Sequence, residues 1–384
     1  MFFVRPLRLL GYGQLLLITP IVLALPILLK QLVVRGFSDK SVVLSRYDLY
    51  VLLLLSLFLL AIINSLFYNS TSENLQNVFY IFSGLFIYLL VRLLDWNMNN
   101  TYVFSLILLF CTSIYTISEF YLYYNYPFLT SYVGHYKQEL QGVLIFNIPE
   151  NDYFIFGYGI KPFGVMMEAS SSGALSALLV IFIIVFQKQY SKNRFYLYIS
   201  VLLGLFAVFF SGSKTAYLIL GVCFTLWALF SNNASLKTKL YTLTLSLSIF
   251  LLIIDFLAEG VHLDKYFDRM LFDTAQFFYS MIGSNFFDLL VGSGEVGQNR
   301  IGMHNTEVDL INSIIRYGVF FVATFLLLMY KSLKYEAQGM VFFVAIIISM
   351  LHYSVIFKFP VFSYLLLIVS SQANMNKTFN KLIK

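Results

Sequence analysis

The second half of the sequence holds side chains of the types that bind phosphate groups and exchange protons. The cations of this set are Lys214, Arg269, Arg300 and Arg316, and its proton-exchanging groups are His304, Glu307 and Asp309. Arginine and lysine are common phosphate ligands, and arginine can contact two phosphate oxygens at once. Histidine has an ordinary pKa near neutral pH, which suits a general base. The set therefore has the residue types needed to hold a diphosphate and to remove a proton.

The glycine-rich segment 291–309 leads into the densest group of these residues. It reads Val291-Gly-Ser-Gly-Glu-Val-Gly-Gln-Asn-Arg-Ile-Gly-Met-His-Asn-Thr-Glu-Val-Asp309. Its glycines allow tight turns and close approach of the backbone to a ligand. Four polar residues then recur at intervals of four, three and four: Asn305, Asp309, Asn312 and Arg316. That spacing places them on one face of a helix.

Burying an acid and a guanidinium in an apolar helix is costly, and such residues usually face a water-filled cavity or each other. We therefore predict a polar cavity beside Asp309 and Arg316. The alternative is a brace within the helix, in which Asn312 bonds to Asp309 or to Arg316.

The segment Ser211-Gly-Ser-Lys-Thr215 predicts a tight turn between two apolar runs, with Lys214 at the start of the second run. A lysine in that position opposes the helix dipole. Its charge is better explained if a phosphate or carboxylate also binds at that helix N-terminus. The alternative is that Lys214 extends to the lipid headgroups. The glycine pattern of a P-loop is absent, so the turn does not predict nucleotide hydrolysis.

The elements that position these residues are apolar runs of membrane-spanning length. Of the 384 residues, 59% are hydrophobic and 11% charged, against about 25% charged in soluble domains. We predict an all-α polytopic membrane protein with one membrane domain over 1–384 and about eleven (ten to twelve) transmembrane helices. The predicted helices are 13–29, 49–67, 78–94, 101–121, 172–187, 195–210, 213–230, 240–258, 308–329, 339–353 and 359–374.

Lysine and arginine gather in alternate connections, which predicts that those connections share the cytoplasmic side. The groups lie at 30–46, 92, 188–194, 237–239, 331–334 and 377–384. The remaining connections are then external, and two of them are long, about 122–171 and 259–307. Long loops in compact proteins are usually functional. We therefore expect any chemistry at the external face.

The sequence does not predict a bound metal or another cofactor. No histidine has the spacing of a metal-ligand motif such as His-Glu-x-x-His. Both cysteines, Cys111 and Cys223, stand inside apolar runs, where they are packing residues. The formal charge of +6 is scattered among short connections rather than gathered on one face, so nucleic-acid binding is not predicted.

Three short motifs carry a resemblance to a known family. Ser211-Gly-Ser-Lys-Thr-Ala216 is similar to a Ser-Arg-Thr/Gly-Ala turn, with Lys214 where arginine is usual. Arg269 followed by Leu290-Val-Gly-Ser-Gly294 looks like a loop arginine that precedes a Gly-x-Gly turn. His304-Asn305, with Glu307-Val-Asp309 through Arg316-Tyr-Gly318, resembles the motif that enters the following helix. These motifs resemble those of the bacterial O-antigen polymerase and O-antigen ligase family of membrane glycosyltransferases.

The resemblance implies transfer of a glycan from a polyprenyl diphosphate, such as undecaprenyl diphosphate, to an acceptor sugar at the external face of the bacterial inner membrane. Neither a nucleotide sugar nor a metal takes part. Arg269, with Lys214 and Arg316, would hold the diphosphate. His304, or an acid among Glu307 and Asp309, would activate the acceptor hydroxyl. The expected partners are the lipid-linked oligosaccharide, membrane lipid, and chain-length regulator and flippase proteins.

Two alternatives stay open beside a polymerase of O-antigen, capsule or exopolysaccharide repeat units. An O-antigen ligase would transfer finished glycan, but the long interval from His304 to Gly318 favours the polymerase. A polysaccharide flippase or transporter is the alternative of another class. Such folds usually contain related halves with broken helices in corresponding positions, and the sequence has no such pairing.

Overall fold

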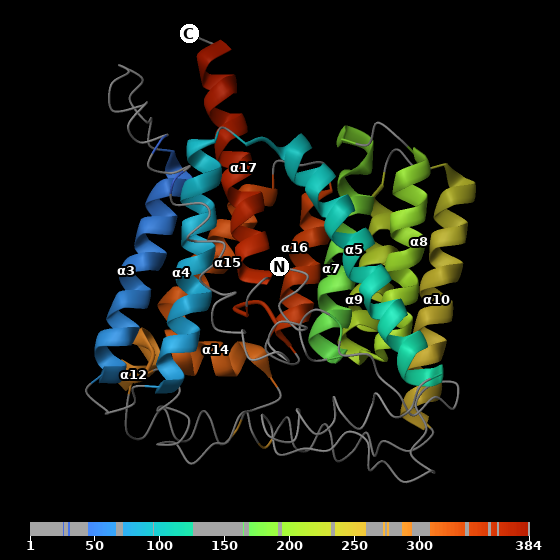
Figure 1. Cartoon of the computed structure of the whole chain (residues 1–384), viewed down its shortest axis with the longest axis horizontal. Helices are drawn as coiled ribbons and strands as arrows, with labels where there is room; N and C mark the ends of the chain where they lie inside the picture. The colour runs from blue at the N-terminus through green and yellow to red at the C-terminus, as the bar shows by residue number, and fades with distance from the viewer. Residues whose placement is uncertain are drawn as a thin grey trace. The chain divides into compact units, whose positions relative to one another are not determined.

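All secondary structure in the described part of the chain is helical (Figure 1). The computed structural model describes residues 45–66, 72–94, 96–125, 164, 169–190, 194–231, 235–258, 286–293, 308–334, 338–351, 355–358 and 361–382, with isolated positions at 26, 30, 272 and 275. No strand occurs within these ranges. The predicted all-α class is therefore confirmed for the described part of the chain.

Several of these helices are apolar enough to indicate a membrane protein. Three have the length and composition to cross a bilayer, namely Arg46–Ser65, Met98–Tyr121 and Arg194–Ser211. Asp309–Tyr317 and Val319–Leu333 would together make a fourth span, bent by 117°. The shorter apolar helices are Tyr80–Leu93, Ser171–Gln187, Lys214–Phe230, Gly339–Met350 and Val361–Met375. Eleven spans are thus not confirmed, and the helix predicted at 13–29 lies outside the described residues.

Contacts between Cα atoms divide the chain into two compact units. Unit 1 consists of Met1–Ile18 and Tyr102–Gly260, and unit 2 of Thr19–Thr101 and Val261–Lys384. The division assigns Lys214 to unit 1 and every other predicted site residue to unit 2. A single membrane domain over 1–384 stays a prediction.

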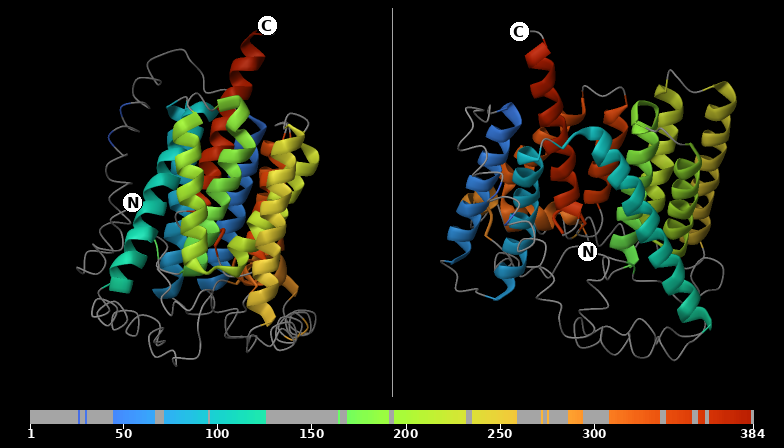
Figure 2. Two further views of the ribbon diagram at one scale, coloured as in Figure 1. Left: turned by 90° about the vertical axis from the view of Figure 1, so that its right-hand side faces the viewer. Right: turned by 45° about the horizontal axis from the view of Figure 1, so that its top comes forward.

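Unit 1 is built around a helix that is buried on all sides. Its helices are most of α5 (Met98–Asn125), α7 (Ala169–Tyr190), α8 (Arg194–Ser211), α9 (Lys214–Phe230) and α10 (Leu236–Ala258). α7 packs against α8 and α9, and α9 packs against α10, as both views of Figure 2 show. Gly204 of α8 permits close packing, because a Cβ there would lie 2.7 Å from a methyl group of Val180 in α7. A helix that is apolar all round, such as α7, forms the core of its unit.

The described helices of unit 2 range in length from 6 to 22 residues. They are α3 (Arg46–Leu66), α4 (Ser72–Leu93), α12 (Phe286–Val291), α14 (Asp309–Tyr317), α15 (Val319–Leu333), α16 (Gly339–Met350) and α17 (Val361–Leu382). α17 lies along α4, and α15 packs against α3, α16 and α17. In Figure 1, α14 lies across the direction of α3 and α4.

The prediction of one helix over 308–329 is wrong, because the chain turns sharply at Gly318. α14 and α15 meet there at 117°. Gly318 has φ +86° and ψ 156°, which is not a helical conformation. Glycine adopts positive φ at little cost, whereas other residues do not. The α14–α15 elbow, as we call this break, places Asp309 and Arg316 on a short helix instead of on a straight span.

Polar contacts show which helix ends of unit 2 lie together. Arg92, near the end of α4, pairs with Asp48 in the first turn of α3, and its guanidinium reaches Asn374 in α17. The Tyr47 hydroxyl of α3 donates to the carbonyl oxygen of Lys331, near the end of α15, at 3.3 Å. We call this the Arg92 end. It gathers helix termini that carry lysine and arginine, as the alternating charge pattern requires.

The opposite ends of the same helices form the Asp309 end of unit 2. Asn64, near the end of α3, contacts α12. Asp309, at the start of α14, contacts residues 355 and 356 between α16 and α17. The long connection 259–307 leads into this end.

Candidate functional site

The structure describes Lys214, Asp309 and Arg316 among the predicted site residues. Arg269, Arg300, His304 and Glu307 lie outside the described residues, and their roles stay predictions. Asp309 and Arg316 are brought together on α14, a helix of 9 residues. Asp309 occupies its first turn and Arg316 its last, which suits the helix dipole at both ends.

Asp309 is fully buried and anchors a turn of the backbone. Its Oδ2 accepts hydrogen bonds from the amides of Val355 at 3.2 Å and Ile356 at 3.4 Å. Its Oδ1 accepts from the Ser313 hydroxyl at 3.3 Å. The carboxylate therefore holds the connection between α16 and α17, and proton abstraction by Asp309 stays a prediction.

The segment after α12 crosses the α14–α15 elbow with its backbone in direct contact. Gly292 has φ +88°, and a Cβ on it would lie 2.5 Å from the carbonyl carbon of Tyr317 and 2.7 Å from the carbonyl oxygen of Arg316. A Cβ on Gly318 would likewise meet the carbonyl oxygen of Leu290. Ser293 donates its amide to Ile315 O at 2.9 Å. We call this crossing the glycine contact. Gly292 therefore lies close to the chain's own backbone, whereas the sequence suggested that these glycines approach a ligand.

Asn64 and Asp288 are buried polar residues beside this crossing that sequence reasoning missed. The Asn64 Nδ2 donates to Asp288 Oδ1 at 2.7 Å and to the carbonyl oxygen of Gly292 at 2.8 Å. Both side chains are nearly covered, with 9% and 5% exposed. The available signal was a lone asparagine at the end of an apolar run, which is unusual in a membrane helix.

Lys214 stands at the N-terminus of α9 in unit 1, after the predicted tight turn. Ser213 caps the helix, since its hydroxyl oxygen accepts from the Ala216 amide at 3.3 Å. The Ser211 hydroxyl oxygen accepts from the Ser213 amide at 3.3 Å. Gly173 of α7 lies against these serines, because a Cβ there would meet both side chains. The turn is thus rigid, with Lys214 half-buried beside it.

Glu119 is a second buried acid that sequence reasoning missed. It lies on α5 inside the candidate span Met98–Tyr121 and is 6% exposed. Its Oε2 accepts from the Gly164 amide at 2.8 Å. Gly164 has φ +61°, and a Cβ there would lie 2.6 Å from Ser172 Cβ. Glu119 therefore ties the segment before α7 to α5.

Replacing Glu119 with alanine is expected to lower the free energy of unfolding by about 1–3 kcal/mol, because the buried Gly164 amide loses its acceptor. Thermal unfolding of the purified protein in detergent measures the change. Glu119→Gln keeps an acceptor oxygen and should stay closer to the wild type. Equal melting temperatures for Glu119→Ala and the wild type would contradict this role.

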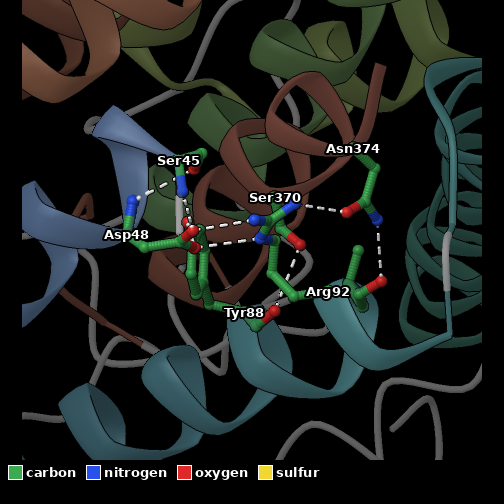
Figure 3. A network of polar contacts seen from close by, with 7 residues as sticks. Ser45, Asp48, Tyr88, Arg92, Ser370 and Asn374 are labelled. Atoms are coloured by element: carbon green, nitrogen blue, oxygen red, sulfur yellow. Dashed lines mark hydrogen bonds and ion pairs between the residues drawn. The ribbon is translucent and has the colours of Figure 1, made fainter. Parts of the chain in front are cut away.

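An extensively bonded polar network lies at the Arg92 end of unit 2 (Figure 3). Asp48 Oδ1 accepts from the Tyr88 hydroxyl at 2.7 Å and from Arg92 Nε at 2.9 Å. Asp48 Oδ2 accepts from Arg92 Nη2 at 2.7 Å and from the Ser45 amide at 2.6 Å. Arg92 Nη1 donates to Asn374 Oδ1 at 2.5 Å. The carboxylate is thus fully occupied, and the network joins α3, α4 and α17.

The described part of the chain holds no group of three or more histidine, cysteine, aspartate or glutamate residues that could bind a metal ion. Neither Cys111 nor Cys223 forms a disulfide bond among the described residues. Each buried acid found there, at positions 119, 288 and 309, accepts hydrogen bonds from the protein, as does the half-buried Asp48. These carboxylates therefore make contacts that hold parts of the fold together.

Comparison with known proteins gives no match. No family model matches the chain, and neither a curated protein nor a solved structure is similar to it. The resemblance to membrane glycosyltransferases therefore rests on the three sequence motifs.

Proposed function

We propose that this protein is a polysaccharide repeat-unit polymerase of the bacterial inner membrane, with about eleven membrane-spanning helices. It transfers glycan from a polyprenyl diphosphate donor to an acceptor sugar at the external face. One observation carries the proposal. The described parts of two motifs that resemble the family separately, 290–293 and 309–318, pack against each other through the glycine contact. Residues that serve one site are expected to meet in this way.

The chemistry requires positive charge near the diphosphate and a base near the acceptor. The acceptor hydroxyl oxygen attacks the anomeric carbon of the donor, and the bond from that carbon to the diphosphate oxygen breaks. The diphosphate leaves with the electron pair, and the hydroxyl proton passes to the base. Arg269, Arg300 and Arg316 stabilise the charge that develops on the leaving group. Because both oxygens of Asp309 are engaged, His304 and Glu307 are the better bases.

Lys214 is proposed as a further phosphate ligand because of its surroundings in unit 1. It lies at the N-terminus of a helix of 17 residues, where backbone amides favour an anion. The neighbouring Thr215 hydroxyl is buried and has no hydrogen-bond partner among the described residues. A bound phosphate oxygen would satisfy that donor.

A reconstituted vesicle assay tests the proposal. It contains purified protein, one synthetic polyprenyl diphosphate repeat unit and a chelator, without nucleotide, and it is read as a ladder of glycan lengths. The wild type should produce a ladder, and Arg316→Ala or Arg269→Ala should slow its growth about 100-fold, because a cation that binds the diphosphate and stabilises its developing charge is lost.

The matched control is Arg46→Ala, which removes an exposed arginine from the Arg92 end of the same unit. It should leave the ladder unchanged. Exchange of the lipid between leaflets without a ladder would replace the proposal with a flippase. Transfer of a single finished glycan to another acceptor would replace it with a ligase.

A further inference from the structure

Asn64 connects three separate segments at the Asp309 end. From α3, its single side-chain nitrogen donates one hydrogen bond to the Asp288 carboxylate of α12 and another to the carbonyl oxygen of Gly292. Both hydrogens of the amide are therefore used. A bond to an ionised acceptor is stronger and shorter than a neutral one. The position of Gly292 relative to α3 is thus set by Asn64 and Asp288 together.

The glycine contact transmits this position to Arg316. The amide of Gly292 donates to the carbonyl oxygen of Asp288 at 2.8 Å, so α12 and Gly292 move as one piece. Gly292 then lies directly on the backbone of Arg316 and Tyr317. The Ser293 amide donates to the carbonyl oxygen of Ile315, the residue before Arg316 in α14. Any displacement of Gly292 would therefore displace the backbone from which the Arg316 side chain extends.

Apolar contacts already hold α3 to the elbow without help from Asn64. The Phe58 ring of α3 lies 6.1 Å from the Tyr317 ring and 6.3 Å from the Phe321 ring, between centroids. Such apolar packing holds α3 against the elbow without fixing their relative orientation. Hydrogen bonds do fix an orientation, because their strength depends steeply on direction. A buried asparagine and aspartate at this point are therefore suited to fixing an orientation.

We propose that Asn64 and Asp288 are positioning residues that hold Arg316 in the orientation that binds the donor diphosphate. The inference rests on the proposed function, in which Arg316 is a diphosphate ligand. Asn64 and Asp288 touch neither donor nor acceptor and act through the glycine contact. Loss of their bond should weaken diphosphate binding more than it slows the transfer step.

The test compares Asn64→Asp, Asp288→Asn and the exchanged pair that carries both changes. Each single variant should raise the KM for the lipid-linked repeat unit about tenfold with a smaller change in kcat, since small displacements of positioned groups are costly. The exchanged pair restores an amide-to-carboxylate bond between the two positions, although not the bond to Gly292. The KM of the exchanged pair should therefore lie between that of the single variants and that of the wild type. Asn374→Ala is the matched control, because it removes a buried asparagine from the Arg92 end.

The same change made in the Arg316→Ala variant shows whether Asn64 and Asp288 act through Arg316. In Arg316→Ala, adding Asn64→Asp should not raise the KM further, since the group that it positions is gone. A full additional tenfold increase would overturn the inference. So would single variants that lower the yield of folded protein but leave the KM of the remainder unchanged, because that result describes a purely structural pair.

Binding of inorganic diphosphate to the same variants separates this inference from the proposed function. It is measured as a shift in melting temperature and needs no polymerisation. If the wild type makes no ladder but binds diphosphate with an affinity that the pair controls, the polymerase proposal fails and the inference stands. If a ladder forms and both single variants bind and polymerise like the wild type, the inference fails alone. If the wild type neither polymerises nor binds diphosphate, both fail.

Discussion

Arg92→Ala is expected to lower the free energy of unfolding by up to about 3–5 kcal/mol, because it removes a buried guanidinium and leaves the half-buried Asp48 carboxylate without its cation. Arg92 supplies hydrogen bonds to both oxygens of that carboxylate and a third bond to Asn374. The variant therefore loosens α3, α4 and α17 together. Thermal unfolding in detergent and the amount of protein in the membrane measure the loss.

The double variant Asp48→Asn with Arg92→Leu serves as the control for this ion pair. It removes the buried charge along with its partner, so it should be more stable than Arg92→Ala alone. Arg46→Ala, at an exposed position two residues from Asp48, should behave like the wild type. If Arg92→Ala unfolded at the wild-type temperature, the network in Figure 3 would not stabilise the fold.

Gly318→Ala is expected to have a comparable effect at the opposite end of unit 2, about 2–5 kcal/mol, because positive φ and steric overlap both oppose a Cβ. The added carbon would meet the backbone of Leu290 and Val291, which has no flexible end to move aside. The elbow and the segment after α12 must then separate. Both the melting temperature and the length ladder should fall.

Gly339→Ala provides the comparison for Gly318→Ala. Gly339 is the first residue of α16, where a helical conformation accepts alanine. It tests whether any added methyl group in unit 2 is harmful. A wild-type melting temperature for Gly318→Ala would show that the glycine contact is not required for the fold.

The helices themselves could be predicted from the sequence, because apolar runs must form helices in lipid. The predicted runs 195–210, 213–230 and 240–258 each coincide with an observed helix, and the turn at 211–213 lies where the serines and Gly212 indicate it. Such features depend on neighbouring residues only. The count of spans depends also on helix lengths, and it was not recovered.

The elbow could not be predicted because its cause lies elsewhere in the chain. Residues 308–329 read as one apolar run, and Gly318 alone does not require a break. The break follows from the backbone of Gly292, which occupies the space beside Gly318. Hydropathy along a window contains no information about such a partner.

For the site residues too, the sequence predicted local grouping but not contacts with distant segments. Spacing correctly grouped Asp309 and Arg316 on one helix, but not the partners of Asp309, which are amides from the turn 355–356. Glu119 and Asn64 were visible as isolated polar residues in apolar runs. Their partners, Gly164 and Gly292, belong to distant segments, so their structural roles needed the folded chain.

The short α15 implies a hydrophobic mismatch at the Asp309 end of unit 2. Its 15 residues span about 22 Å, against about 30 Å for the hydrocarbon core. α3 begins and α15 ends at the Arg92 end, where the Tyr47 hydroxyl donates to the carbonyl oxygen of Lys331, and Phe58 lies beside the elbow. α3 then continues to Leu66, about 12 Å further. The end of α3 therefore extends past the elbow. In the proposed polymerase, either the bilayer thins at the elbow or the lipid diphosphate descends to meet Arg316, so bilayer thickness would influence how the donor reaches Arg316.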